Sequence, residues 1–162
     1  MIQTRATAPM DPAIAAVRDA DAPDWLAMRC ALWPDHTPHE HRDEMRDLAA
    51  RVEFAAFIAR NGARRALGFA EIFVRPFANG CMGRPVPFLE GIWVAPEARR
   101  KGIGRALLGA VEAWAHGRGF GELGSDALID NARSHAAHAG WGFVETERVV
   151  YFRKPLTASG TL

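Results

Sequence analysis

The stretch Val94–Gly104, VAPEARRKGIG, decides the fold class of this chain. It follows an apolar segment, Phe88–Val94 (FLEGIWV), which has the length and composition of a buried strand. After it, apolar residues recur at i, i+4, i+7, i+8 and i+11, which predicts an amphipathic helix beginning near Ile103. That stripe consists of Ile103, Leu107, Ala110, Val111 and Trp114. A strand that turns through glycines into such a helix predicts an α/β architecture.

The turn itself has the pattern R-x-x-G-x-G, formed by Arg99, Gly102 and Gly104. Glycines let backbone N–H groups approach a ligand closely, and a helix N-terminus offers unpaired donors and a positive dipole end. We therefore expect an anion site suited to a pyrophosphate. The alternative is an ordinary glycine-bearing turn, but the strand before it and the helix after it favour the anion site. Positive charge around this turn comes from Arg99, Arg100, Lys101 and Arg105.

Two helices are expected near the N-terminus, after a short strand at Ala13–Val17. Asp21 is positioned to cap a helix from Ala22 to about Trp33, and Pro34 ends it because the residue before a proline avoids the α region. Thr37, with a proline and then Glu40 after it, has the pattern of a capping box. A second, highly charged helix should therefore run to about Ala50.

The remaining segments alternate between strands and helices. Asn61-Gly62 separates the apolar segments Glu53–Arg60 and Ala66–Arg75, which predicts a β-hairpin. After the long helix we expect a strand at Glu122–Ala127 and a short helix at Asn131–Ala139. Two last strands are predicted, at Gly142–Thr146 and Arg148–Arg153. The order β-α-α-β-β-β-α-β-α-β-β predicts an α/β (α+β) fold with one mixed central sheet flanked by helices.

Length and composition restrict the class of protein. The 162 residues, 49% of them apolar, are enough for one well-packed domain. We expect a flexible extension at residues 1–12, a domain at 13–156 and a frayed tail at 157–162. A net charge of +1 argues against a nucleic-acid partner, and no apolar run is long enough to span a membrane. Two cysteines outside any CxxC spacing, without a secretory signal, indicate a cytoplasmic protein.

The R-x-x-G-x-G turn is followed by N-x-x-S-x-x-A-H-x-x-x-G-F at Asn131–Phe143. Together these motifs resemble the GCN5-related N-acetyltransferase superfamily, and the resemblance extends over about Ala13–Pro155. It implies a fold with a mixed sheet, and acetyl-CoA as donor and sole cofactor. It also implies that the diphosphate meets backbone amides in the turn and that the pantetheine arm lies along the apolar strand. The implied cofactor-binding residues are Ile92, Trp93, Val94, Arg99, Arg100, Lys101, Gly102, Ile103, Gly104, Arg105, Asn131 and Ser134.

Four further segments resemble the aminoglycoside 6'-N-acetyltransferases, in particular those with L-W-P-x-H near the N-terminus. These segments are ALWPDH (31–36), FLEGIWV (88–94), SDALIDN (125–131) and GFVETERV (142–149). The resemblance implies that a small cationic aminosugar is the acceptor and that Glu90 and Asp126 line its site. It makes the chain a candidate antibiotic-resistance enzyme. The implied substrate-binding residues are Trp33, Asp35, His36, Glu90 and Asp126.

Acetyl transfer to an amine requires a neutral amine, so a base is useful at neutral pH. Glu90 is a candidate because it lies inside an apolar strand, where acids are uncommon without a partner. A solvent-facing carboxylate, or one paired with an arginine, is the alternative for this residue. Asp126 is the second candidate because it ends a strand, although turns and caps also favour aspartate. The sequence does not decide which of the two is the base.

The developing oxyanion and the departing thiolate also need partners. We expect the oxyanion donor to be a backbone N–H on the segment 90–94, since Gly91 suggests a β-bulge there. The superfamily often has a tyrosine acid at the position that is His138 here. Histidine can donate a proton near neutrality, so His138 is the candidate acid, or else a structural helix residue. A thiol with a pKa of about 8.5 can also leave with little help.

A metal site is not expected. His36, His39 and His41 cluster in the sequence, but their spacing matches no zinc signature and suits a solvated helix start. Two other functions stay open, namely an acetyltransferase for a polyamine, amino acid or peptide, and a non-catalytic acyl-CoA-binding module. The apolar run Val149–Phe152 suggests edge pairing across a homodimer, with an internal hairpin in a monomer as the alternative.

Overall fold

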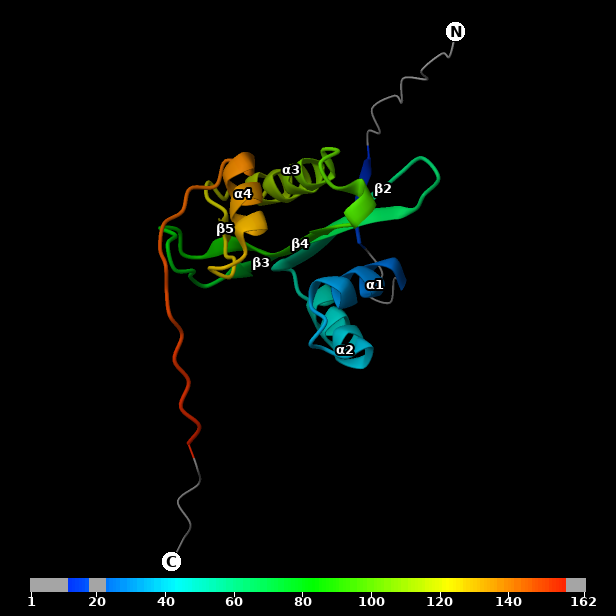
Figure 1. Cartoon of the computed structure of the whole chain (residues 1–162). Helices are drawn as coiled ribbons and strands as arrows, with labels where there is room; N and C mark the ends of the chain where they lie inside the picture. The colour runs from blue at the N-terminus through cyan, green and yellow to red at the C-terminus, as the bar shows by residue number, and fades with distance from the viewer. Residues whose placement is uncertain (1–11, 18–22, 157–162) are drawn as a thin grey trace, which may run out of the picture.

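The computed structural model of the chain describes residues 12–17 and 23–156. Within them a mixed sheet lies between two pairs of helices (Figure 1). The predictions for Asp21 and Ala22, and for most of the two terminal segments, fall outside the described residues. The elements are β1 (Ala13–Ala16), α1 (Pro23–Leu32), α2 (Pro38–Ala49), β2 (Phe54–Arg60), β3 (Ala66–Arg75), β4 (Val86–Val94), the 3₁₀ turn η1 (Pro96–Ala98), α3 (Ile103–His116), β5 (Gly124–Ser125) and α4 (Ala132–Trp141).

The sheet has the order β1-β2-β3-β4-β5. The first four strands pair antiparallel, and β5 pairs parallel to β4. Helices α1 and α2 cover one face of the sheet, and α3 and α4 lie on the other (Figure 1). The predicted mixed sheet flanked by helices is therefore confirmed.

Each face of the sheet has its own core. On the α3 side, Ile103, Leu107 and Val111 are almost completely buried against the sheet, as the stripe predicted. On the opposite face, Trp25 and Met45 pack against Phe69 and bury α1 and α2. Burial of this kind is worth about 1.5–3 kcal/mol for each large side chain, so both helical layers are held by packing.

Helix α2 begins where the capping box predicted. The Thr37 hydroxyl accepts a hydrogen bond from the N–H of Glu40, whose carboxylate in turn accepts from the N–H of Thr37. These hydrogen bonds lower the pKa of the Glu40 carboxyl. The reciprocal contacts satisfy two donors that a helix start otherwise leaves unpaired, which fixes the direction in which α2 leaves the turn.

The β2–β3 hairpin forms, and residues 61–65 connect its strands, as the predicted segments required. The Asn61 side chain accepts from the N–H of Arg65, and Arg64 adopts a left-handed conformation with φ of 62°. Strand β4 begins two residues earlier than expected, at Val86, and the helix predicted at Asn131–Ala139 runs from Ala132 to Trp141.

The last part of the chain differs from the prediction. Strands expected at Gly142–Thr146 and Arg148–Arg153 do not form, and the strand expected at Glu122–Ala127 is reduced to Gly124–Ser125. Residues 142–156, here called the C-terminal arm, run extended and mostly exposed away from the sheet (Figure 1). A strand forms only by pairing with a neighbouring edge, and the arm runs away from the sheet without pairing with the open edge of β5.

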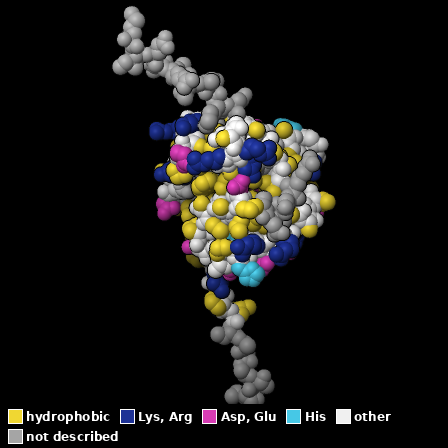
Figure 2. Space-filling view, turned by 90° about the vertical axis from the view of Figure 1, so that its right-hand side faces the viewer, with side chains coloured by type: hydrophobic (Ala, Val, Ile, Leu, Met, Phe, Trp, Pro, Cys, Tyr) yellow, Lys and Arg dark blue, Asp and Glu magenta, His cyan; other side chains and the backbone are white. Residues whose placement is uncertain are grey.

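Apolar side chains are unusually exposed on this arm. In the space-filling view, hydrophobic side chains stand clear of the body just before the undescribed C-terminal residues (Figure 2). On the body in the same view, hydrophobic side chains gather across the middle, and Lys and Arg lie around them (Figure 2). The exposed large apolar residues of the arm are Val144, Val149, Val150, Tyr151, Phe152 and Leu156. No described helix combines the length and hydrophobicity needed to cross a membrane.

Candidate active site

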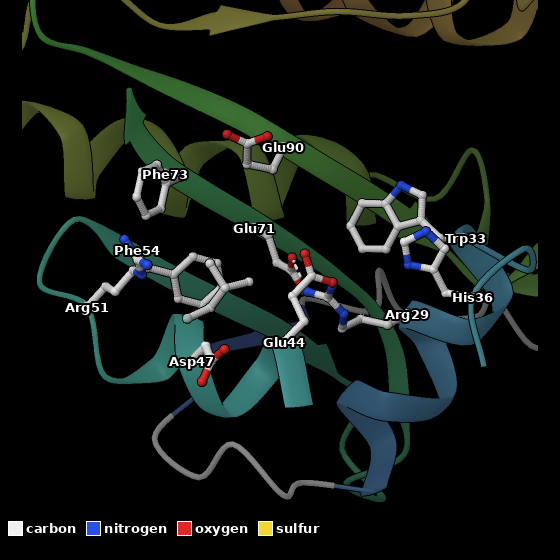
Figure 3. A pocket seen from close by; sticks show the side chains of 11 residues that line it. Arg29, Trp33, His36, Glu44, Asp47, Arg51, Phe54, Glu71, Phe73 and Glu90 are labelled. Atoms are coloured by element: carbon white, nitrogen blue, oxygen red, sulfur yellow. Dashed lines mark hydrogen bonds and ion pairs between the residues drawn. The ribbon is translucent and has the colours of Figure 1, made fainter. Parts of the chain in front are cut away.

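A cavity of about 510 Å³ opens between helices α1 and α2 and strands β3 and β4 (Figure 3). We call it the acceptor cavity, after the role that the sequence predicts for Trp33, His36 and Glu90 in its lining. Its walls bring together residues that lie far apart in the sequence, and four of them are carboxylates. The lining residues are Arg29, Trp33, His36, Glu44, Asp47, Leu48, Arg51, Phe54, Glu71, Phe73 and Glu90.

Glu90 reaches the cavity because strand β4 bulges there. Ile72 pairs with Leu89 and Glu71 pairs with Gly91, so Glu90 is the extra residue in the ladder. A bulge redirects one side chain, and this one directs a carboxylate into the cavity. The sequence placed a bulge at Gly91, and the structure puts the extra residue directly before it.

Both oxygens of Glu90 are held by Arg75, a residue that the sequence analysis did not single out. The Arg75 Nε donates to Oε1 at 2.8 Å, and Nη2 donates to Oε2 at 2.5 Å. The guanidinium also lies 3.6 Å from the centre of the Phe88 ring. Its hydrogen bonds to Glu90 raise the pKa of Arg75. The sequence offers two alternatives for Glu90, a carboxylate of the site or one paired with an arginine. In the structure Glu90 lines the cavity and also pairs with Arg75.

The floor of the cavity is a buried charge cluster. Glu71 accepts from Trp25 Nε1 at 2.6 Å and from Arg29 Nη1 at 2.5 Å, and its side chain is 2% exposed. Burial raises the pKa of Glu71 to about 7, against the opposing effect of the Arg29 charge and the hydrogen bonds. The other end of the Arg29 guanidinium donates to Glu44 on α2. One arginine therefore joins the core to the cavity wall.

Trp33 forms the wall next to Glu90. A Cβ at Gly91 would lie 2.5 Å from Cζ2 of Trp33, so only glycine allows the indole to pack this closely on β4. The Arg29 guanidinium lies 4.8 Å from the indole centre on another side, within range of a cation–π contact. Trp33 therefore serves both the core and the cavity.

The predicted acceptor residues are only partly brought together. Trp33, His36 and Glu90 line the cavity, whereas Asp35 and Asp126 are exposed and do not. Asp126 directly follows β5, and its charge contributes to the raised pKa of Arg75. Asp126 therefore contributes to the charge around Arg75 without lining the cavity.

Strands β4 and β5 separate immediately beside Glu90. Their pairing ends at Leu89 and Ser125, so the outer edge of β4 from Glu90 to Val94 has no strand neighbour among the described residues. Backbone polar groups on such an edge are available to an extended ligand. The segment with Ile92, Trp93 and Val94, predicted to bind the pantetheine arm, is this open edge.

The turn before α3 has the geometry that the R-x-x-G-x-G pattern predicted. Arg100 and Gly102 adopt left-handed conformations, with φ of 59° and 82°, and Arg99 donates from Nε to the carbonyl of Val94 at 3.0 Å. No side chain caps α3, and the position of a Cβ at Gly102 is open space. The first amides of α3 therefore remain available to an anion.

Two residues of the turn have structural partners on α4. Arg105 donates to the carbonyls of Gly140 and Trp141, so its side chain joins α3 to the end of α4. A Cβ at Gly104 would lie 2.7 Å from the Trp141 indole. The charge of Arg105 is thus used at the α3–α4 contact, and the exposed side chains of Arg100 and Lys101 are left to face solvent.

Helix α4 connects back to the point where the strands separate. Asn131 caps it by accepting from the N–H of Ser134. His138 Nδ1 lies 2.8 Å from the carbonyl of Ser134, and Nε2 lies 2.9 Å from the hydroxyl of Ser125 on β5. Ser125 was missed by the sequence analysis, because nothing in its local pattern indicates a partner thirteen residues away.

A cluster of possible metal ligands lies beside the cavity. Ligand atoms of His36, His41 and Glu44 lie within 4.8 Å of one another. Arg29 Nε donates to Nδ1 of the buried His41, whose Nε2 is 3.0 Å from the carbonyl of Trp33. Both nitrogens of that ring are engaged and a guanidinium adjoins them, so the cluster does not suit a cation.

Comparison with known proteins places these features in context. Residues 16–143 match the model of the Acetyltransferase (GNAT) family. The aminoglycoside N(6')-acetyltransferase type 1 of Klebsiella aerogenes is 46% identical over 148 residues, which cover 90% of this chain and 97% of the relative. The enzyme of the same name from Serratia marcescens is 47% identical over 133 residues, covering 82% and 91%.

Solved structures of enzymes with similar names also resemble this chain over most of its length. The aminoglycoside antibiotic 6'-N-acetyltransferase AAC(6')-Ih from Acinetobacter baumannii matches with a TM-score of 0.84 and 43% identity, over 90% of this chain and 99% of that one. AAC(6')-Iy in complex with the bisubstrate analogue CoA-S-monomethyl-acetylneamine matches with a TM-score of 0.84 and 35% identity, over the same shares.

Proposed function

The chain belongs to the Acetyltransferase (GNAT) family, and we propose that it transfers the acetyl group of acetyl-CoA to the 6'-amine of aminoglycosides. One observation supports this above all others. The open edge of β4 and the acidic cavity meet at a single bulged residue, Glu90. A donor lying along that edge and a cationic acceptor in that cavity would therefore bring their reacting atoms together at the bulge.

Acetyl-CoA is the co-substrate, and it supplies an acyl thioester. The diphosphate would be bound by the backbone amides at the start of α3, those of Gly102, Ile103, Gly104 and Arg105, with charge from Arg99, Arg100 and Lys101. Ile92, Trp93 and Val94 would hold the pantetheine arm. Asn131 accepts from the N–H of Ser134, so the two residues cap helix α4. From this position Asn131 would lie next to the pantetheine arm.

The acceptor would enter as a polycation. Four carboxylates line the cavity, and three arginines partly neutralise them, namely Arg29 and Arg51 in the lining and Arg75 paired with Glu90. The one carboxylate in excess favours ammonium groups. Glu44 and Asp47 lie three residues apart on one face of α2, away from Glu90, and would meet the more distant rings (Figure 3). Trp33 and His36 offer ring faces to a sugar.

In the reaction the neutral amine nitrogen attacks the thioester carbonyl, and backbone N–H groups of β4 beyond the bulge stabilise the oxyanion. The ammonium first loses a proton, for which Glu90 and Asp126 are the candidate acceptors. The C–S bond then breaks, the attacking nitrogen loses its second proton as the amide forms, and the thiolate takes a proton, so that one proton is released overall. We assign the proton that the thiolate takes to the hydroxyl of Ser125, which His138 can resupply across 2.9 Å.

We also infer that two copies pair through the C-terminal arm. The arm exposes apolar side chains, and β5 has no neighbour on its outer edge among the described residues. A second copy would supply the missing strand and cover the apolar residues. Two free cysteines and the use of acetyl-CoA support a cytoplasmic location.

Thiol release from acetyl-CoA with kanamycin, tobramycin and spermidine tests the function. We expect turnover with both aminoglycosides, and a fall of about 100-fold or more in kcat/KM for Glu90→Gln with unchanged CoA binding. Glu53→Gln, an exposed acid outside the cavity, is the matched control. Turnover with spermidine alone would mean that the acceptor is a polyamine and not an aminoglycoside. CoA binding without turnover of any acceptor would favour a non-catalytic acyl-CoA-binding module.

Light scattering coupled to gel filtration tests the pairing. The full chain should elute with twice the mass of one copy, and Phe152→Asp should shift the mass toward one copy because a buried charge opposes association. Phe152 is 94% exposed within one copy, so the substitution leaves the fold of that copy intact. A single-copy mass for the unmodified chain would overturn the inference.

A further inference from the structure

We propose that Glu44 anchors a second ammonium group of the acceptor, and that Arg29 is the positioning residue that holds Glu44 in place for this. This role rests on the proposed acetyl transfer and determines which acceptors it uses. Arg29 on α1 and Glu44 on α2 both line the acceptor cavity, whereas Glu90 enters it from β4 (Figure 3).

The Arg29 guanidinium is held on three sides in the core. Nη1 donates to the buried Glu71 on β3 at 2.5 Å, and Nε donates to Nδ1 of His41 on α2 at 3.5 Å. The centre of the Trp33 indole lies 4.8 Å from the guanidinium. The Arg29 side chain is only 3% exposed, so the remaining nitrogen, Nη2, has a set direction, and it donates to Glu44.

This contact fixes a side chain that would otherwise be free to move. Glu44 is 49% exposed, and a long exposed glutamate loses rotamer freedom when a ligand orders it. A buried arginine removes that freedom before the acceptor arrives. Among the described residues only Arg29 donates to the Glu44 carboxylate, through Oε2, so Oε1 stays open to an N–H group of an ammonium.

The charges around Arg29 leave Glu44 with net negative charge. Arg29 pairs with two carboxylates, of which Glu71 is buried in the core and Glu44 faces the cavity. The single guanidinium charge is therefore balanced from below, and the second carboxylate charge is left at the cavity. Glu90 differs, because Arg75 pairs with Glu90 and with no other described carboxylate. The carboxylate in excess over the arginines therefore lies at Glu44.

Glu44 and Glu90 give the cavity two fixed points that can accept from ammonium groups. The other solvent-facing acid and base of the lining, Asp47 and Arg51, have opposite charges, and neither forms an ion pair with a described residue. Two fixed points select an acceptor by the distance between its ammonium groups. A rigid ring system maintains that distance, whereas a flexible polyamine loses conformational freedom to match it. The arrangement therefore favours a rigid aminosugar over a polyamine chain.

A double-mutant cycle on the KM for kanamycin tests the role of Arg29, at pH 8, above the pKa of about 7 that burial gives Glu71. Glu44→Gln keeps an oxygen that can accept from Arg29 but removes the charge, so KM should rise about tenfold with kcat nearly unchanged. Arg29→Lys should raise KM about fivefold, because an ammonium cannot hold two carboxylates as a planar fork. In the double variant KM should stay within about twofold of that of Glu44→Gln alone.

Arg46→Lys is the matched control, because Arg46 is an exposed arginine of α2 that pairs with Asp43 outside the cavity. Its KM should equal that of the unmodified chain. A purely structural role for Arg29 predicts that Arg29→Lys lowers the melting temperature and the fraction of chain that binds CoA. KM would then be unchanged, or would rise by the same factor with and without Glu44→Gln. Either result would overturn the proposal.

An acceptor with one ammonium group tests the second anchoring point directly. With 6-amino-6-deoxyglucose, Glu44→Gln should leave kcat/KM unchanged, since the only ammonium of this acceptor goes to the bulge at Glu90. A loss as large as that with kanamycin would contradict a separate second point and overturn the proposal. Turnover of kanamycin by the unmodified chain reports on the acetyl transfer independently, so failure of these tests leaves the proposed function standing.

Discussion

The two halves of the proposed site, one for the donor and one for the acceptor, are built by different means. The donor half is mostly backbone, namely the first amides of α3 and the open edge of β4, and both come from one continuous stretch, 90–105. The acceptor half is mostly side chains, brought from α1, α2, β3 and β4 and held by charge pairs. A backbone site depends on where glycines allow the chain to turn, whereas a side-chain site depends on partners far away in the sequence.

The two halves also differ in how far a substitution in each should lower the stability of the fold. The donor turn contains no buried charge, so changes there should affect the ligand and cost the fold little. The acceptor cavity has Glu71 and Arg29 as its floor, and both belong to the core beneath α1. Changes there should reach stability as well as binding. Four predictions separate the two halves on this basis.

The largest effect is expected from Arg29→Ala. Removing this guanidinium leaves Glu71 buried without its charged partner, which should lower the free energy of unfolding by about 3–5 kcal/mol at pH 8. Urea unfolding followed by tryptophan fluorescence measures the loss. Arg105→Ala on the donor side removes hydrogen bonds of an exposed arginine and should cost only about 1 kcal/mol. Equal losses in the two variants would contradict the distinction.

The pH dependence of stability gives the next effect. The pKa of Glu71 is raised from 4.5 to about 7, so the folded chain binds this proton more tightly than the unfolded chain. Its contribution is complete below about pH 4.5 and is lost as the pH rises to 7, by up to about 3 kcal/mol. The difference in unfolding free energy between the unmodified chain and Glu71→Gln should shrink accordingly from pH 5 to 7.

The stability that other carboxyls contribute changes with pH in the opposite direction. For this reason the quantity to measure is the difference in unfolding free energy between the unmodified chain and Glu71→Gln. Glu40, for example, has a pKa lowered by its hydrogen bonds to Thr37, and it titrates in both chains alike. A difference that grows with pH would mean that Arg29 holds Glu71 as a permanent carboxylate and that burial is the weaker influence.

Two glycines provide a smaller and more selective test. Gly102→Ala forces a left-handed alanine, which costs about 1–2 kcal/mol and should weaken CoA binding about 5- to 30-fold with the acceptor KM unchanged. Gly91→Ala displaces the Trp33 indole, which should lower kcat/KM for kanamycin about tenfold or more with CoA binding unchanged. Calorimetry with CoA and initial rates of thiol release distinguish them. If either variant changed CoA binding and the kinetics with kanamycin equally, the donor and acceptor halves would not be independent.

The smallest effect is expected from Asp47→Asn on α2. Asp47 lines the cavity and forms no ion pair with a described residue, so it is available to a distant ammonium of the acceptor. The KM for kanamycin should rise about 2- to 5-fold, more at low salt, with kcat unchanged. Asp43→Asn is the control, since Asp43 pairs with Arg46 outside the cavity. A rise in KM that does not depend on ionic strength would argue against recognition of the acceptor by charge.

The same contrast explains how much of the molecule could be predicted from its sequence. The donor turn depends on local rules, because glycine spacing, helix periodicity and the end of an apolar strand are all visible in one short stretch. The α2 capping box and the β2–β3 hairpin follow equally local patterns, and each is confirmed. Trp33, His36 and Glu90, which the resemblance to a family implied as acceptor residues, line one cavity, and their role in binding an acceptor stays a prediction.

What could not be predicted depends on distant contacts. Nothing around Arg75 indicates that a bulge fifteen residues later will turn Glu90 toward it. Arg29 looks like an ordinary helix arginine until Glu71, forty-two residues away, lies beneath it. The last two strands were predicted from β-forming residues, but a strand also requires an edge, and sequence patterns do not say whether that edge belongs to the same copy.

Arg29 has a consequence for how this site could change over generations. It is shared between the core and the cavity wall, so α1 tolerates few replacements at that position. Helix α2 presents Asp47 on its surface without an ion pair to a described residue, so replacements there alter the charge of the cavity and hardly touch the packing beneath. Selection for a different antibiotic would therefore find its accessible mutations on α2, while the floor of the cavity stays the same.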